Sequence, residues 1–293
     1  MILLLYGYTS STPGRYLEDE LKRKNIAYYR HSGSNKRMID RKKIKSIIFI
    51  ESPSTKDFSL KEFKGYDVPK IYWMHHGQNH LKKNKRRILD FKPDLILMSH
   101  SLHLAKHLSA PVKFFPFATD TNVFKNEKSW SDRKYDLAFV GRCKKGYEDR
   151  KKIIDTVARY CKNNNKTFIL KKNCTPSQMS NIYKETKIVI NPIHDTIPSI
   201  NMRLWEAMGS GCLCLSQTSQ LQETIFQNEK HYVTFNNNQD ISKKMTDIFN
   251  NLKKYEEMSL YSYNNVLDKH LYSHRVDTVL KYIDDIKNKE FLK

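Results

Sequence analysis

The chain has 293 residues, of which 39% are hydrophobic, and it carries a formal net charge of +21 at pH 7. This length suits two domains of ordinary size or one large domain. The five cysteines form an odd set without regular spacing, which argues against a disulfide framework. The apolar stretch at residues 2–5 is too short for a membrane span or a signal sequence, so we expect the protein in the cytoplasm, or in the host cytoplasm if a phage encodes it.

Short apolar runs alternate with amphipathic stretches along the chain. In the first half we expect strands at residues 2–7, 26–30, 46–51, 70–75, 94–100 and 112–117, with helices at 14–24 and 101–108. After a polar segment at 118–134, strands at 135–141, 167–171, 188–192, 212–216 and 232–235 alternate with helices at 149–162, 176–184, 200–208 and 220–227. Helices at 240–252 and 255–289 close the chain.

Continuous apolar strands separated by helices indicate parallel sheets that are covered on both faces. Two such series joined by a polar linker predict an α/β protein with two doubly wound Rossmann-like domains facing across a cleft. We place the domains at residues 1–125 and 126–270, and we expect a helix at 271–293 to cross back toward the first domain. Ligands of such domains bind beyond the carboxyl ends of the strands.

The stretch "NMRLWEAMGSGCLCLSQ" (201–217) combines a helix with polar residues at one of these edges. Ser199 is a good N-cap after Pro198, so we expect the helix to begin near residue 200. Arg203 and Glu206 are three residues apart and share a face of the helix. The arginine can hold a pyrophosphate and the glutamate can accept hydrogen bonds from a ribose diol. The alternative is a salt bridge on a solvated helix.

The stretch "YDLAFVGR" places Gly141 and Arg142 at the end of a strand, with Lys144 and Lys145 close behind. A glycine there lets the backbone approach a phosphate, and basic side chains neutralise the phosphate. An ordinary strand-end turn would give the same pattern. There is no G-x-G-x-x-G or Walker A motif, so a dinucleotide or P-loop site is not expected.

Histidines are frequent near the expected strand ends. His75 and His76 end a strand, and a histidine there can hydrogen-bond a ligand or stabilise developing charge, although a buried pair is equally consistent with the pattern. A second set comprises His100, His103 and His107. Because no H-E-x-x-H or Cys–His pattern accompanies them, we expect no metal site.

The second half of the sequence resembles the GT-B glycosyltransferases, in particular the CgeB/YkvP-like group and the broader retaining family-four-like enzymes. The stretches that carry the resemblance are "VKFFPFATDTNVF" (112–124), "YDLAFVGR" (135–142) and "NMRLWEAMGSGCLCLSQ" (201–217). The resemblance implies a GT-B fold, a metal-independent retaining glycosyltransferase, and a nucleoside-diphosphate sugar, UDP-linked, as donor substrate without a further cofactor.

The resemblance also implies roles for single residues. Glu206 falls where such enzymes hold the ribose, and Arg142 and Lys145 fall where they hold the pyrophosphate. Asn201 and Arg203 match the N-x-R-x-x-E pattern of the CgeB-like group.

There is one departure from the pattern. Many relatives carry a glutamate near the sugar, eight positions before the ribose-binding one, and this chain has Pro198 there. Asp195 or His194 can substitute for it. We therefore take Asp195 and His76 as the candidate catalytic residues.

The excess of positive charge bears on the acceptor. It is concentrated in the first 125 residues, with clusters at 35–45 and 82–87, and codon bias of an AT-rich genome is the alternative explanation. We expect a polyanionic acceptor, with DNA that carries a hydroxymethylated base favoured. An envelope, spore-coat or teichoic-type acceptor at an anionic membrane surface is a second possibility. The third is an inactive nucleic-acid-binding protein with a GT-B fold. The oligomeric state is left open.

Overall fold

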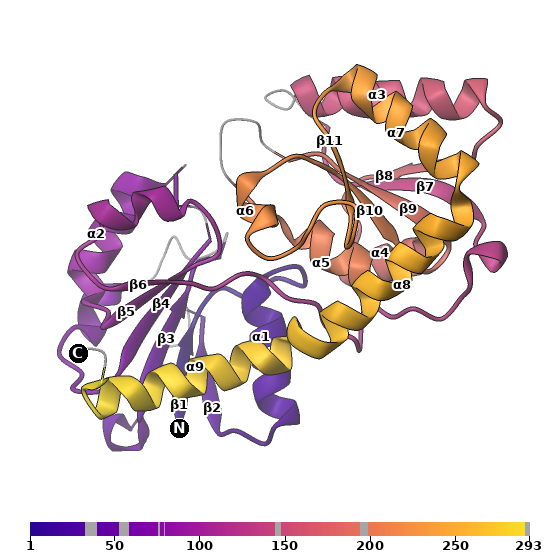
Figure 1. Ribbon diagram of the computed structural model, residues 1–293. Coiled ribbons are helices and arrows are strands. Elements are labelled where there is room, and N and C mark those ends of the chain that lie inside the picture. The colour runs from indigo at the N-terminus through magenta and orange to yellow at the C-terminus, as the bar shows by residue number, and fades with distance from the viewer. Residues whose placement is uncertain are drawn as a thin grey trace. The chain divides into compact units, whose positions relative to one another are not determined.

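The computed structural model describes residues 1–32, 40–52, 59–75, 77–78, 80–143, 148–193 and 199–290. The chain forms two compact units (Figure 1). Unit 1 combines Met1–Pro116 with Tyr272–Lys293, and unit 2 is the segment Phe117–Leu271. Unit 2 is therefore continuous in sequence, whereas unit 1 is assembled from both ends of the chain.

Unit 1 is built on a parallel sheet. Over the described residues it has six strands in the order β2-β1-β3-β4-β5-β6, and each neighbouring pair is parallel. The strands are β1 (Ile2–Leu5), β2 (Tyr28–His31), β3 (Ser46–Ile50), β4 (Lys70–Met74), β5 (Leu95–Met98) and β6 (Val112–Phe114). β1, β3, β4 and β5 are buried along their whole length, which is why they read as unbroken apolar runs.

Helices cover both faces of this sheet. α1 (Pro13–Arg23) packs against α9 (Tyr272–Lys287), where the rings of Tyr16 and Tyr272 stack at 5.1 Å (Figure 1). The other face carries α2 (Leu81–Phe91) and the 3-10 helices η3 (Leu60–Phe63) and η4 (Leu102–His107). Alternate side chains of the strands pack toward α2, as expected for a two-sided sheet.

Unit 2 repeats this design. Over its described residues it has a parallel sheet of five strands in the order β11-β10-β9-β7-β8. The strands are β7 (Tyr135–Val140), β8 (Phe168–Lys171), β9 (Thr186–Asn191), β10 (Leu213–Gln217) and β11 (Val233–Phe235). The helices are α3 (Glu148–Asn163), α4 (Pro176–Lys184), α5 (Met202–Gly209), α6 (Gln220–Glu223), α7 (Asn238–Asn250) and α8 (Leu252–Lys269). The predicted α/β class with two parallel-sheet Rossmann-like domains is thus confirmed.

Some predicted elements were wrong in kind or in extent. Residues 101–108 form the 3-10 helix η4 rather than an α-helix. The long helix predicted at 255–289 is divided at His270 and Leu271 into α8 and α9. At the division the backbone N–H of Thr119 donates to the carbonyl of His270 at 3.0 Å.

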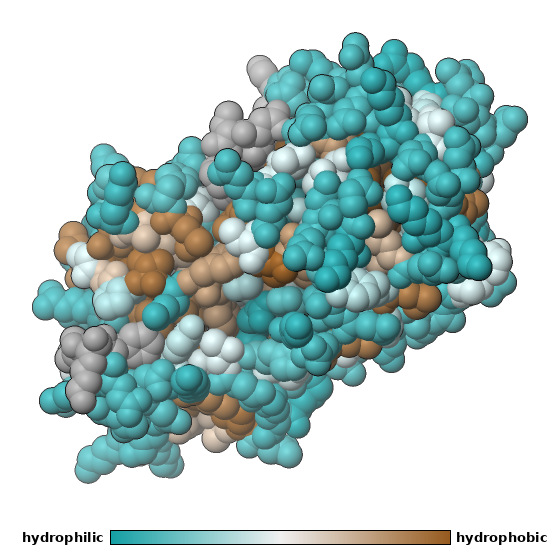
Figure 2. Space-filling view, viewed as in Figure 1, coloured by the Kyte–Doolittle hydropathy of each residue, from teal (hydrophilic) through white to brown (hydrophobic). Residues whose placement is uncertain are grey.

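Hydrophilic residues cover most of the face that Figure 2 shows. Across the described ranges, no helix combines the length and the apolar character that a bilayer crossing requires. In the same part of the chain, His, Cys, Asp and Glu side chains form no group of three that could hold a metal ion.

Candidate functional site

Arg203 lies at the carboxyl edge of the unit 2 sheet, on the helix α5 that follows β9. Its Nε and Nη2 donate to the carbonyl oxygen of Val140 at 3.2 and 3.0 Å, and its Nη1 donates to Oδ1 of Asn191 at 3.1 Å. The guanidinium also lies over the ring of Phe139, 4.8 Å from its centroid. Because Val140 and Asn191 are the last residues of β7 and β9, Arg203 ties both strand ends to α5, and these contacts fix its orientation.

Asn191 is held in turn by the neighbouring strand. Its Nδ2 donates to Oγ of Ser216 in β10 at 2.9 Å, and Ser216 also bonds the side chain of Gln222 at 3.1 Å. All three side chains are buried. The amide of Asn191 is therefore oriented with its oxygen toward Arg203, since its nitrogen is already used.

Gly141 leaves the space that Arg203 occupies. It follows β7 directly, and its N–H donates to the carbonyl of Lys171 at 3.0 Å. A Cβ at this position would lie 2.8 Å from Nη2 of Arg203 and 2.7 Å from Cζ of Phe139. Such contacts are too short to tolerate, so a larger residue would displace the guanidinium.

Glu206 lies one turn along α5 from Arg203. It is only 6% exposed, and its carboxylate accepts no hydrogen bond from the residues that the structure describes. Burial raises the pKa of Glu206 from its ordinary value of 4.5 to about 7, against the opposing effect of Arg203. The alternative of an Arg203–Glu206 salt bridge on a solvated helix is therefore wrong, since the glutamate is buried and the arginine bonds other groups.

The two side chains give the site an unbalanced positive charge. Within the described ranges, no carboxylate forms an ion pair with Arg203, and near neutral pH Glu206 is only partly ionised. A fixed guanidinium beside a carboxyl group without hydrogen-bond donors can take an anion together with a pair of hydroxyl groups.

Asn201, rather than Ser199, is the N-cap of α5. Its backbone is extended, with φ −98° and ψ 165°, and the helix begins at Met202. The carbonyl of Ser199 instead accepts a hydrogen bond from Oγ of Ser219 at 3.0 Å. Oδ1 of Asn201 is buried without a hydrogen-bond partner among the described residues, and it makes no side-chain cap to the first turn. A hydrogen-bond acceptor and the amino-terminal end of a helix therefore lie at the same edge as Arg203.

Arg142 follows Gly141 and is exposed. Its Nε donates to Oδ1 of Asn173 at 3.2 Å, and its carbonyl accepts from Nη1 of Arg150 at 3.2 Å. The structure thus places Arg142 next to the strand edge that holds Arg203, with its side chain directed to the loop that precedes α4.

Three of the predicted site residues, Lys145, His76 and Asp195, lie outside the described residues. Of the histidine pair, His75 is described and is buried after β4. Its ring packs edge-on against Trp73, with the ring centroids 4.7 Å apart, and its backbone N–H donates to Oε2 of Glu51 at 2.8 Å. His75 is thus part of the unit 1 core.

A buried polar cluster at the carboxyl edge of the unit 1 sheet escaped the sequence analysis. Glu51 follows β3 and is 3% exposed. Its Oε1 lies 3.2 Å from Nδ1 of His80 and 3.3 Å from Nη1 of Arg87, which also donates to Oδ1 of Asn84 at 3.2 Å. The signal in the sequence is an acid directly after an unbroken apolar strand, at the edge where ligands bind.

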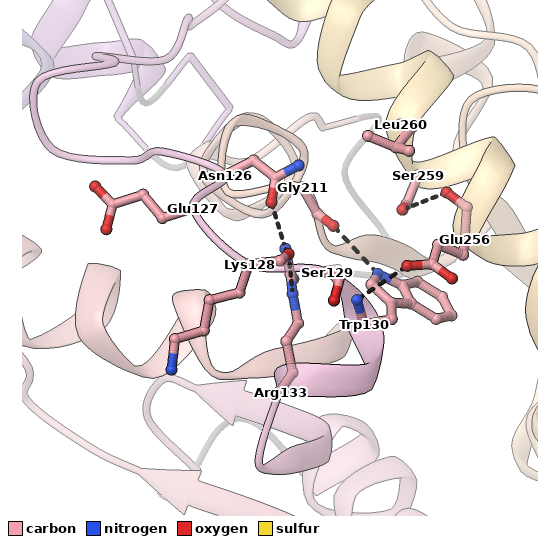
Figure 3. Close-up of a pocket in the computed structure, with 10 residues that line it drawn as sticks. All are labelled: Asn126, Glu127, Lys128, Ser129, Trp130, Arg133, Gly211, Glu256, Ser259 and Leu260. Atoms are coloured by element: carbon pink, nitrogen blue, oxygen red, sulfur yellow. Dashed lines mark hydrogen bonds between the residues drawn. The ribbon is translucent and has the colours of Figure 1, made fainter.

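A pocket of about 340 Å³ in unit 2 lies away from this edge (Figure 3). Its lining comes from the segment before β7, including Trp130 and Arg133, from Gly211 before β10, and from α8. The guanidinium of Arg133 bonds protein groups, among them Oδ1 of Asn126 and the carbonyl of Ser210. This arrangement stabilises the amino-terminal side of the sheet and leaves Arg133 engaged within the protein.

Known structures share this fold at low sequence identity. HepE of Anabaena, solved with UDP and glucose, has a TM-score of 0.67 at 9% identity, over 97% of this chain and 100% of that one. Sucrose-phosphate synthase of Thermosynechococcus elongatus has a TM-score of 0.66 at 10% identity, over 100% and 99% of the two chains. An α-glucosyltransferase, solved with UDP-glucose and DNA containing an abasic site, has a TM-score of 0.63 at 10% identity, over 96% and 98%.

Sequence comparison identifies the family. No curated protein sequence matches the chain significantly. The family model described as glycosyl transferase-like matches residues 128–281, which is more than half of the chain and includes Gly141, Arg203 and Glu206. The chain therefore belongs to the glycosyl transferase-like family.

Proposed function

We propose that the chain transfers a sugar from a UDP-linked donor to a hydroxyl group of a polyanionic acceptor, with DNA that carries a hydroxymethylated base favoured. The observation that supports the donor half is that a fixed Arg203 and a buried Glu206, whose carboxylate bonds none of the described residues, share one face of α5. The N-x-R-x-x-E pattern at 201–206 supports a further assignment to the CgeB/YkvP-like group.

Arg203 is suited to bind the diphosphate of the donor. Three hydrogen bonds hold its guanidinium before any ligand arrives, so little reorganisation is needed when charge develops on the departing diphosphate. Arg142, exposed on the same edge, adds a second cation, and Lys145 a third from the sequence. We expect these residues to act on the reaction mainly by stabilising the negative charge of the leaving group.

Glu206 is suited to bind the ribose of the donor nucleotide. A carboxylate that accepts no hydrogen bond from the described residues can accept two from a ribose diol, and Oδ1 of the N-cap Asn201 is a further acceptor. HepE and the α-glucosyltransferase were each solved with UDP or UDP-glucose, which supports a uridine nucleotide here.

The chemical step is proposed to retain the configuration of the sugar and to need no metal ion. The bond between the anomeric carbon and the diphosphate oxygen breaks, a bond to the acceptor oxygen forms, and the acceptor proton leaves with the diphosphate. His76 and Asp195 are the sequence-based candidates for contacts to the sugar.

The proposed polyanionic acceptor is inferred from the positive charge of the chain. The excess of basic residues is concentrated in the first 125 residues, and α2 presents Lys82, Lys85 and Arg86 on its exposed side. The solved complex of the α-glucosyltransferase with DNA gives this acceptor a precedent within the fold. An envelope-type polymer at an anionic membrane is the second candidate, and an inactive nucleic-acid-binding protein is the third.

Stabilisation by UDP tests the donor site. We expect UDP to raise the melting temperature of the native chain, and Arg203→Ala and Glu206→Gln to reduce that increase. Lys287→Ala is the matched control, because Lys287 forms an exposed salt bridge with Asp284 on α9, which belongs to unit 1. An equal response in all four proteins would refute the site.

Transfer assays test the reaction. A panel of nucleotide sugars is incubated with hydroxymethylated and with ordinary DNA, and the mass of the digested nucleosides and the release of UDP are followed. A sugar-sized mass increase on the modified base would establish the proposed activity. Release of UDP with unchanged DNA would favour an envelope acceptor. No change in nucleoside mass and no release of UDP, together with tight DNA binding, would favour the inactive binding protein.

A further inference from the structure

Tyr8 is an exposed aromatic residue on the loop that follows β1. The residue is 50% exposed, and its hydroxyl forms no hydrogen bond with any residue that the structure describes. The guanidinium of Arg30, on the edge strand β2, lies over the ring at 4.7 Å from the centroid. A tyrosine whose ring rests on a cation and whose remaining surface meets solvent is a ready platform for a second flat ring.

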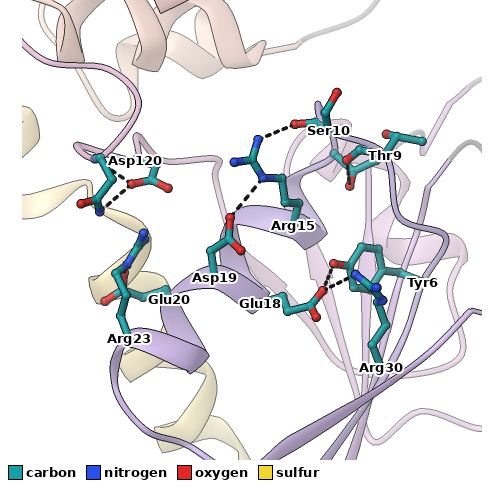
Figure 4. Close-up of polar contacts among 12 residues, drawn as sticks. Tyr6, Thr9, Ser10, Arg15, Glu18, Asp19, Glu20, Arg23, Arg30 and Asp120 are labelled. Atoms are coloured by element: carbon teal, nitrogen blue, oxygen red, sulfur yellow. Dashed lines mark hydrogen bonds and ion pairs between the residues drawn. The ribbon is translucent and has the colours of Figure 1, made fainter. Parts of the chain in front are cut away.

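Arg30 is held in place without Tyr8. Its Nη1 donates to Oε2 of Glu18 at 2.9 Å, and Glu18 also accepts from the hydroxyl of Tyr6 (Figure 4). The buried ring of Tyr6 lies 5.8 Å from the same guanidinium. Glu18, itself bonded by Tyr6, therefore fixes Arg30, whereas the half-exposed ring of Tyr8 buries little apolar surface.

The loop that carries Tyr8 is fixed on both sides of the residue. The N–H of Gly7 donates to the buried Oγ of Ser52, which follows β3, at 2.9 Å. Nη1 of Arg15 donates to the carbonyl of Ser10 at 2.9 Å, and its Nε bonds Asp19 at 3.1 Å (Figure 4). Stacking on a fixed loop costs little ordering entropy, which is the condition for a useful platform.

The loop that carries Tyr8 lies at an edge of the sheet where a ligand is expected to bind. It follows the carboxyl end of β1, the edge at which doubly wound sheets bind ligands. The guanidinium of Arg30 covers one face of the ring and pairs with Glu18, so the other face is the one open to a stacked base.

We propose that Tyr8, backed by Arg30, stacks on an unpaired nucleobase of a nucleic-acid acceptor. The inference deepens the proposed function and rests on its acceptor half. A base to be modified must leave the duplex stack, and an aromatic platform on the acceptor-binding unit offsets part of that cost. A sugar can also stack on an aromatic ring through its C–H groups, but the excess of basic residues in the first 125 positions favours a ligand that carries phosphate.

The test measures binding of a short, fluorescein-labelled single strand to the full chain by anisotropy. Loss of one base stack weakens such binding about 5- to 150-fold, so we expect Tyr8→Ala to weaken it within this range. Tyr8→Phe should bind like the native chain, because the ring is kept. Tyr261→Ala is the matched control, since Tyr261 is 45% exposed and lies under Lys230 in unit 2.

A strand of abasic nucleotides separates stacking from charge. It has the same phosphates without bases, so native protein and Tyr8→Ala should bind it equally and more weakly than the native protein binds the ordinary strand. The melting temperature of Tyr8→Ala should stay within a degree or so of the native value, because a half-exposed ring adds little to stability.

Three outcomes would overturn the inference. They are equal binding of the ordinary strand by native protein and Tyr8→Ala, an equal loss on the abasic strand, and absence of binding by the native protein. The response to UDP at Arg203 and Glu206 is measured separately. Failure of the Tyr8 platform with an intact UDP response would leave the donor site standing, whereas failure of the UDP response would count against the proposed transferase and not against Tyr8.

Discussion

Arg203 donates two hydrogen bonds to the carbonyl oxygen of Val140, the residue with which β7 ends. This contact makes the guanidinium part of the sheet edge rather than a mobile surface charge. The third bond, to Asn191, extends the same fixation to β9. The side chain is therefore already positioned for an anion before one binds, and its geometry should matter as much as its charge.

Replacing Arg203 by lysine separates geometry from charge. Lysine keeps the positive charge but lacks the planar fork that bonds Val140 and Asn191. Hydrogen bonds to charged groups contribute about 1.5–3 kcal/mol, so we expect the affinity for UDP, measured by calorimetry, to fall about 10- to 150-fold. Arg159→Lys on the exposed side of α3 is the control and should bind UDP like the native chain. Native-like affinity of Arg203→Lys would show that charge alone suffices.

Glu206 predicts a pH dependence of stability. Its pKa is raised by burial to about 7, so between pH 4.5 and about 7 the folded chain holds a proton that the unfolded chain has lost. Stability contributed by the neutral carboxyl is therefore present below pH 4.5 and is lost as pH rises through about 7. Glu206→Gln lacks this loss, and its advantage in free energy of unfolding should grow by up to about 3 kcal/mol between acid and pH 8. Denaturant unfolding at a series of pH values measures it, and a constant difference would contradict a buried carboxyl.

The same titration should affect donor binding with the opposite sign. A ribose diol donates hydrogen bonds, and only the ionised carboxylate accepts them on both oxygens. The affinity of the native chain for UDP should therefore rise as pH increases through about 7. Glu206→Gln should bind UDP weakly with a flat profile, and a pH-dependent profile in that variant would assign the effect to another group.

Gly209 predicts a steric effect on folding. A Cβ at this position would lie 2.3 Å from Oγ1 of the buried Thr119. Gly209→Ala should therefore lower the free energy of unfolding by about 1–3 kcal/mol through overpacking. Gly65→Ala is the control, because a Cβ there meets no atom within 4 Å. Thermal denaturation of both variants decides the point, and equal melting temperatures would be inconsistent with the contact.

The cysteines should differ in reactivity. Burial raises the pKa of Cys212 to about 11 and that of Cys161 to about 12, and it raises the pKa of Cys214 further. Cys143 and Cys174 are partly exposed. A thiol reagent at pH 8 should therefore label these two in the native chain and all five after unfolding. Mass spectrometry gives the count, and fast native labelling of Cys212 would contradict its burial.

Local patterns predicted the strands well because each buried parallel strand is an unbroken apolar run. They failed where distant residues decide the structure. The basic run at 82–87 lies in a helix in which Arg87 is buried, since its partner Glu51 comes from another strand end. No glycine or proline marks the division of α8 from α9, because that division coincides with the pairing of Thr119 with Leu271.

The candidate site shows the same limit. Arg203, Glu206 and Gly141 were predicted from the order of strand, turn and helix. That Gly141 makes room for Arg203 could not be predicted, because the two residues are 62 positions apart and meet only when β7 and α5 pack. The roles of Asn191 and the N-cap Asn201 likewise depend on where β9 ends and α5 begins.

The division of the chain between the units has a consequence during synthesis on the ribosome. Unit 2 is complete once Leu271 has emerged, whereas unit 1 still lacks α9, whose Tyr272 stacks on Tyr16 and whose Asp277 pairs with Lys24 at 2.8 Å. Arg275 of α9 also bonds the carbonyl of Pro116 at 2.8 Å. The segment Met1–Pro116 is thus completed only after unit 2 has been made, and a stop codon within the α9 segment would damage unit 1 while sparing unit 2.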